Sequence, residues 1–264
     1  DEGELLFLAE DCSSVSFFYG NSQIQGGDRT FLATNGRGGM LHVPLKWGEL
    51  NCRYDALLAA NLNPNYPEDR HVMWRRCRIW VKYHGRSVPV SIETAESFQL
   101  DPDGNGTWLF KIPVGKGFFV DLNITAFMVE GRNAVGLNIY RERAMRRRNY
   151  LDDEIPVTVV VRPDIEDRNF HQSTKAMNGP ESSFPKALSA ATKYFNFKPS
   201  SDRTLNISTL KGRFRQSTEW CYGVNQAKES ARGLDPSTDV FSPGFFEIEF
   251  TGGECDQLIG QVIT

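Results

Sequence analysis

The densest group of side chains capable of chemistry lies in the segment 162–171, with the sequence RPDIEDRNFH. Seven of its ten residues can ionise or form hydrogen bonds through their side chains. A glycosidase needs two carboxyl groups, one protonated and one ionised, across the bond that it breaks. Asp164 and Asp167 could serve, but each has an arginine nearby, and a positive charge lowers a carboxyl pKa, which is wrong for a general acid. The segment therefore favours a salt-bridged corner that fixes a loop or docks another domain.

A second polar group, Arg53, Tyr54 and Asp55, directly precedes the apolar run 56–60. We interpret it first as the start of a strand, with polar residues directly before the apolar run. The alternative is a rim that contacts sugar. Arg53 and Asp55 would then supply bidentate hydrogen bonds, and the ring of Tyr54 an apolar face.

Little in the sequence favours a metal or a cofactor, and we expect neither. The histidines have no second His or Cys at metal-ligand spacing, and the five cysteines form no C-x-x-C pair. The stretch 101–106 imitates the start of a calcium loop, but Ile112 stands where a carboxylate is required. The glycine-rich stretch 35–39 is not followed by the helix that a phosphate-binding loop needs. Both stretches are predicted to be turns.

Strands must position these side chains, because apolar and polar residues alternate with period two through much of the chain. In 118–128, Val120, Leu122 and Ile124 share one face, with polar residues between them. A turn at 130–133 and a second alternating run at 135–139 complete an antiparallel hairpin. Other alternating or apolar runs bring the total to about ten strands. They lie at 5–8, 15–19, 56–60, 73–83, 108–112, 157–161, 205–207 and 246–250.

Helical patterns are scarce. The best candidates are 186–195 and a short turn at 226–232. The irregular stretch 170–201 is expected to be a long excursion between sheet segments or a helical insert. Many short strands separated by turn residues predict an all-β fold, and we expect one large antiparallel two-sheet sandwich with few short helices.

The composition excludes several classes of protein. The 264 residues carry a net charge of −3, which argues against a protein that binds nucleic acid through its phosphates. No apolar run is long enough to span a membrane. The odd number of widely spaced cysteines favours reduced core thiols in a cytoplasmic protein over a disulfide framework.

Two motifs resemble the N-terminal domain of bacterial glycogen debranching enzymes of the amylo-α-1,6-glucosidase type. FLATNGRGG at 31–39 is similar to the TNG-x-GG turn of that family, and RYDALLAA at 53–60 to its Arg-Tyr-containing LL-x-A strand. The segments 162–175 and 243–246 are similar to later motifs, so the resemblance covers roughly residues 28–250. One departure is Asp55-Ala56, where many members carry His-Gly.

The resemblance implies a galactose-mutarotase-like β super-sandwich that precedes an all-helical (α/α)6 catalytic barrel. We accordingly expect residues 1–264 to be a single domain, the N-terminal fragment of a longer glycoside hydrolase whose catalytic carboxylates belong to the barrel. Its partners would be that barrel and an α-glucan, and the fragment alone would be inactive. The residues expected at the interdomain or substrate-binding face, none of them catalytic, are Arg53, Tyr54, Asp164, Asp167, Arg168 and His171.

Two alternatives stay open. A self-contained sugar-modifying enzyme of the mutarotase type would use His171 with Asp164 or Glu166 for acid–base catalysis. A purely structural assembly module would instead present an exposed apolar patch and no pocket of the size of a sugar.

Overall fold

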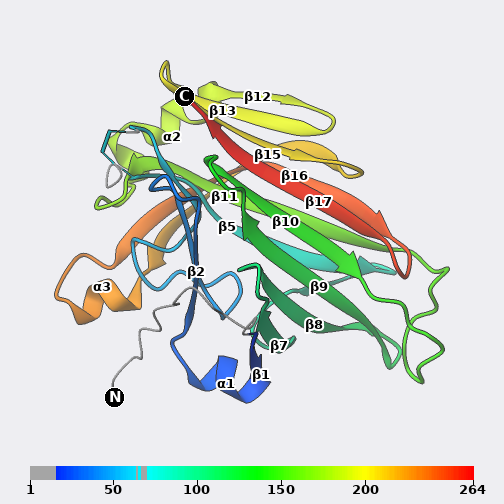
Figure 1. Ribbon diagram of the computed structural model, residues 1–264. Helices are drawn as coiled ribbons and strands as arrows, with labels where there is room; N and C mark the ends of the chain where they lie inside the picture. Colours follow the sequence, from blue (N-terminus) through cyan, green and yellow to red (C-terminus); the bar gives the residue numbers. More distant parts are fainter. Residues whose placement is uncertain (1–15, 64, 67–69) are drawn as a thin grey trace.

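The computed structural model describes residues 16–63, 65–66 and 70–264, and it consists of two antiparallel sheets packed face to face (Figure 1). The nine-stranded sheet contains, in spatial order, β1 (Phe17–Gly20), β7 (Ala95–Leu100), β8 (Gly106–Gly115), β9 (Phe118–Met128), β10 (Ala134–Arg141), β17 (Cys255–Ile263), β14 (Arg203–Thr209), β13 (Tyr194–Ser200) and β12 (Leu188–Ala191). The predicted all-β two-sheet sandwich is therefore confirmed.

The second sheet has eight strands and carries the polar segments singled out from the sequence. Its order is β15 (Arg213–Asn225), β16 (Ser237–Phe250), β11 (Val157–Asn169), β5 (Arg70–Tyr83), β4 (Ala56–Asn61), β3 (Met40–Pro44) and β2 (Thr30–Thr34), and β6 (Arg86–Pro89) pairs with β5. The helical segments are short: α1 (Asn21–Gly26), α2 (Pro180–Ser183), α3 (Ala227–Ala231) and the 3-10 turns η1 (Ala176–Asn178) and η2 (Pro185–Ala187). None of the helices in the described ranges is long and apolar enough to cross a membrane.

The core lies between the sheets and follows from the period-two patterns. Along β5, Cys77, Ile79 and Val81 face the core, so the alternate residues from Arg76 to Lys82 lie on the outer face of the eight-stranded sheet. The two sheets approach each other closely where Trp74 of β5 packs against Gly260 of β17. A Cβ atom on that glycine would lie 2.3 Å from the indole ring. Only glycine leaves room for this contact.

Several local predictions are confirmed. The hairpin expected from 118–139 is β9 paired with β10, and the short helical turn near 226–232 is α3. Residues 35–39 form a tight turn, in which Gly36 and Gly38 adopt positive φ angles of 71° and 89°. The strand expected at 5–8 lies outside the described residues.

The helix predicted for 186–195 is wrong. Residues 188–191 form β12, which pairs with β13 in register from Leu188 opposite Phe197 to Ala191 opposite Tyr194. The alanines in this stretch favour a helix, but Phe195 and Phe197 alternate into the core, and their burial decides the outcome.

Candidate functional site

The polar segment 162–169 is part of a strand. We expected it to begin where a hydrophobic strand ends, but β11 continues to Asn169 through two irregularities in its pairing with β5. Because successive side chains of a strand point to opposite faces of the sheet, the charged side chains of this segment lie in different surroundings. Asp164 and Asp167, both predicted at the site, therefore lie in separate ion-pair clusters.

Asp164 is buried beside the outer face of the eight-stranded sheet. Its carboxylate accepts hydrogen bonds from Arg76 Nε at 2.7 Å and from Arg78 Nη2 at 2.8 Å, both on the neighbouring strand β5. Arg78 also pairs with Glu219 of β15 at 3.0 Å, and its charge helps to lower the pKa of Glu219 against the opposing effect of burial. Asp164 thus holds adjacent strands together and is not exposed to a ligand.

Asp167 links the two sheets. It pairs with His71 Nε2 of β5 at 3.0 Å and with Arg203 Nε of β14, in the other sheet, at 2.7 Å. Burial acts to raise the pKa of Asp167, but the hydrogen bonds and charges of His71 and Arg203 outweigh it and lower the pKa. Asp167 is salt-bridged, as expected, but its partners are His71 and Arg203 and not the Arg162 and Arg168 that neighbour it in the sequence.

Four of the predicted residues do come together, around the turn that precedes β4. Arg53 Nη1 donates to the backbone carbonyl of His171 at 2.8 Å, and the Tyr54 hydroxyl lies 3.3 Å from His171 Nδ1. Arg168 Nη2 donates to the Arg53 carbonyl at 2.6 Å. We call Arg53, Tyr54, Arg168, Phe170, His171 and Glu229 the Arg53 cluster.

Glu229 of α3 anchors this cluster. Its two carboxylate oxygens accept the backbone N–H and the Nε–H of Arg53, each at 3.0 Å. Burial of Glu229 opposes ionisation, but these hydrogen bonds and the charge of Arg53 outweigh it and lower the pKa of Glu229. Glu229 was not predicted from the sequence, because nothing local marks a partner 176 residues away.

The cluster also contains two half-buried aromatic rings, Tyr54 and Phe170, next to the exposed His171. The rings of Tyr54 and Phe170 lie 4.6 Å apart, and the His171 ring stands edge-on to both. Phe170 packs against a small apolar cluster made of Met40, Ala56, Ala59 and Val72. Phe170 was also missed, although it lies within the segment that the sequence singled out.

Buried ion pairs also hold the turn that carries Arg53 in place. Arg168 Nε donates to Glu166, and Arg75 Nε lies 3.7 Å from the same carboxylate. Arg75 also donates to the Arg53 carbonyl at 2.9 Å and to the Cys52 carbonyl at 2.8 Å. Burial lowers the pKa of Arg75 to about 10, against the opposing charge of Glu166, so the side chain is still cationic near neutral pH. The backbone carbonyls of the turn are thus held by two buried guanidinium groups.

The arrangement does not support acid–base catalysis by His171. Glu166 and Asp164, the carboxylates that the mutarotase alternative requires, are both fully buried and paired with arginines. A sugar could not reach either without rearrangement of the strands. The Arg53 cluster instead offers two half-buried aromatic rings, Tyr54 and Phe170, beside the exposed His171 and other hydrogen-bonding groups.

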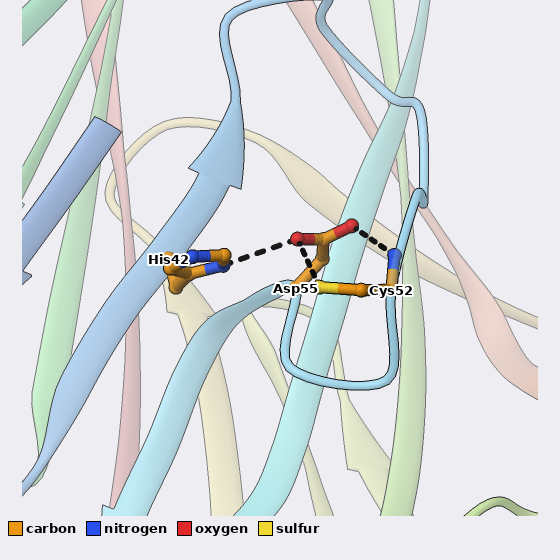
Figure 2. Close-up of side chains that lie close together, drawn as sticks. All are labelled: His42, Cys52 and Asp55. Atoms are coloured by element: carbon orange, nitrogen blue, oxygen red, sulfur yellow. Dashed lines mark hydrogen bonds and ion pairs between the residues drawn. The ribbon is translucent and has the colours of Figure 1, made fainter. Parts of the chain in front are cut away.

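A second group of polar side chains lies on the other side of the same turn. Asp55 lies between the ring of His42 on β3 and the thiol of Cys52 (Figure 2). Its Oδ1 is 3.1 Å from His42 Nδ1 and accepts the Cys52 thiol at 3.1 Å, and its Oδ2 accepts the Cys52 N–H at 2.9 Å. Burial and the nearby Asp55 charge raise the pKa of Cys52 to about 11. The pKa of Asp55 is lowered, because His42 and Arg75 outweigh the effect of burial.

The family comparison agrees with the motifs in the sequence. A family model described as the glycogen debranching enzyme N terminal matches residues 29–256, which include both the Arg53 turn and all of β11. No curated protein sequence gives a significant match to the chain.

Proposed function

Because the chain belongs to the family of glycogen debranching enzyme N-terminal domains, we propose that it is a non-catalytic domain whose Arg53 cluster lines part of an α-glucan cleft. The parent reaction would be the hydrolysis of α-1,6-glucosidic branch linkages, carried out by carboxylates of an (α/α)6 barrel. We also infer a cytoplasmic location, which the free thiols of Cys52, Cys77, Cys221 and Cys255 support.

The observation that carries this proposal is the half-buried ring of Tyr54 beside the exposed His171, both held in place by buried charges. Sugar rings present apolar C–H faces that pack on aromatic side chains, and hydroxyl groups that need hydrogen-bonding partners. The Arg53 cluster supplies both. Since Glu229 fixes Arg53 and Arg168 fixes the turn carbonyl, little side-chain entropy would be lost when a glucan binds.

The outer face of the eight-stranded sheet supports the further proposal that the domain packs on the catalytic barrel. A surface hollow there is lined by Trp80, Val160 and Phe245, together with Arg78, Arg162 and Glu219. The half-buried aromatic rings and the paired charges resemble the mixed apolar and polar composition of interfaces between domains. This face also lies next to the buried Asp164 cluster, so its backbone is rigid.

An activity measurement tests the non-catalytic role. The purified chain is incubated with a branched limit dextrin, and released glucose and new reducing ends are measured. We expect no turnover above a blank without protein. Release of glucose that disappears in His171→Ala would contradict the proposal and favour a self-contained sugar-modifying enzyme that uses His171.

A binding measurement tests the docking face. A separately produced helical catalytic domain of the same family is titrated with the wild-type chain and with Trp80→Ala. We expect a complex with the wild-type chain, and weaker binding by the variant. A complex of equal affinity for both chains would contradict the assignment of this face.

A further inference from the structure

We propose that His42, Cys52 and Asp55 bind one zinc ion, contrary to the expectation from sequence spacing. One nitrogen, one sulfur and one carboxylate oxygen from these residues all lie within 4.8 Å of one another. Figure 2 shows the His42 ring and the Cys52 sulfur directed at the same oxygen of Asp55. Imidazole, thiolate and carboxylate are the three ligand types that zinc takes from proteins.

Two of the three distances between these ligand atoms are close to those of a tetrahedral site. Zinc bonds of roughly 2.0 to 2.3 Å place neighbouring ligand atoms about 3.3 to 3.6 Å apart. The Asp55 oxygen lies 3.1 Å from His42 Nδ1 and 3.1 Å from Cys52 Sγ. Movements of a few tenths of an ångström, on the scale of ordinary side-chain adjustment, would open these contacts enough to admit the ion.

The His42 ring nitrogen and the Cys52 sulfur converge on a single oxygen. His42 Nδ1 is buried, and its polar neighbour among the described residues is Asp55 Oδ1 at 3.1 Å. The same oxygen accepts the Cys52 thiol at 3.1 Å. A bound cation would be coordinated by the nitrogen, the sulfur and this oxygen together.

The charges balance on binding. Zinc forms one bond each to nitrogen, sulfur and oxygen, the Cys52 thiol loses its proton to solvent, and nothing is oxidised or reduced. The dication with one thiolate and one carboxylate is neutral, and Asp55 Oδ2 keeps its hydrogen bond from the Cys52 backbone. Water would take the fourth position from the partly exposed side of His42.

The position of the site gives it a structural role. Cys52 and Asp55 flank Arg53 and Tyr54 in the sequence, and His42 belongs to the neighbouring strand β3. An ion would therefore tie both ends of the Arg53 turn to the sheet. Metal binding is measured directly, so this inference can fail while glucan binding stands, or the reverse.

Cobalt serves as a coloured substitute for zinc in the test. The wild-type chain is stripped with a chelator and titrated with Co²⁺, and absorbance is followed for thiolate-to-cobalt charge transfer in the near ultraviolet. We expect one Co²⁺ per chain, displaced by one equivalent of Zn²⁺. The band should vanish in Cys52→Ser and persist in Cys255→Ser, which removes an exposed thiol instead.

His42→Gln provides a second variant that retains the thiol. We expect it to weaken the binding of Co²⁺ at least about tenfold, because even indirect ligand partners contribute that much. Circular dichroism checks that each variant is folded. Absence of the band in the wild-type chain, its survival in Cys52→Ser, or equal affinities of His42→Gln and the wild type would each overturn the proposal.

Discussion

Arg53 donates both its backbone amide and its guanidinium to the carboxylate of Glu229, so one buried acid fixes the main chain and the side chain of the same residue. Glu229 lies on the short helix α3, between β15 and β16, whereas Arg53 precedes β4 on the other side of the sheet order. This contact joins α3 to the turn before β4, and that turn carries Tyr54.

Replacing Glu229 should destabilise the chain considerably. Glu229→Gln leaves the guanidinium of Arg53 without its anionic partner in a buried setting, a change that typically costs about 3 kcal/mol. Urea denaturation followed by tryptophan fluorescence measures the loss. Lys228→Ala on the same helix removes only the exposed pair with Asp28, and it should cost less than about 1 kcal/mol. Equal costs for the two variants would refute the anchoring role of Glu229.

Asp167 should give the chain a stability that depends on pH. Because its pKa is lowered in the folded state, the unfolded chain takes up a proton there first as the pH falls. The stabilisation is therefore fully present above the ordinary pKa of about 3.9 and is lost as the pH drops through the folded value. Asp167→Asn should cost about 2 kcal/mol at pH 7, and this difference should shrink in acid. A difference that is constant down to the lowest measurable pH would contradict the account.

The close approach of the sheets at Gly260 predicts intolerance to a single methyl group. The indole of Trp74 is completely buried and cannot move away, so Gly260→Ala should destabilise the fold by about 1 to 3 kcal/mol. Gly20→Ala is the matched control, since nothing lies within 4 Å of the added atom. Thermal denaturation of both variants provides the comparison. A neutral Gly260→Ala would show that the sheets are further apart than described.

The cysteines should differ sharply in reactivity. The thiolate is the reactive form, and the pKa of Cys52 is raised to about 11, chiefly by burial. Burial likewise raises the pKa of Cys77, whereas Cys255 is exposed. Iodoacetamide at pH 8 should alkylate Cys255 in the native chain and reach Cys52 and Cys77 only after denaturation. Peptide mapping by mass spectrometry measures this order, and early labelling of Cys52 would contradict its burial.

Much of the fold could be predicted because its strands are half buried. Runs such as Val120 to Ala126 and Val157 to Val161 alternate along the chain, and this pattern alone selects strand and core face. Prediction failed at 188–191, where local composition favours a helix but pairing with β13 decides the structure. It also placed the end of β11 too early, since charged residues there continue the strand.

The candidate site was only half predictable, for a physical reason. Polar types at 53–54 and 162–171 marked the right segments, but only pairing between strands determines which face each side chain occupies. Asp164 and Asp167 therefore joined separate ion pairs, while Arg168 and His171 met Arg53. Glu229 meets Arg53 across 176 residues, and His42 meets Cys52 and Asp55 from the neighbouring strand β3, so no local pattern encodes either contact.

The central claim is that Tyr54 and its neighbours contact an α-glucan, and affinity electrophoresis in gels containing glycogen tests it most directly. We predict that glycogen retards the wild-type chain, and that Tyr54→Ala weakens retention about fivefold, as the loss of an aromatic contact worth about 1 kcal/mol requires. Tyr54→Phe, which keeps the ring, and Tyr194→Ala, which removes an exposed tyrosine from the other sheet, should both be retarded like the wild type. Wild-type mobility that glycogen does not change, or retention that Tyr54→Ala leaves intact, would contradict the claim.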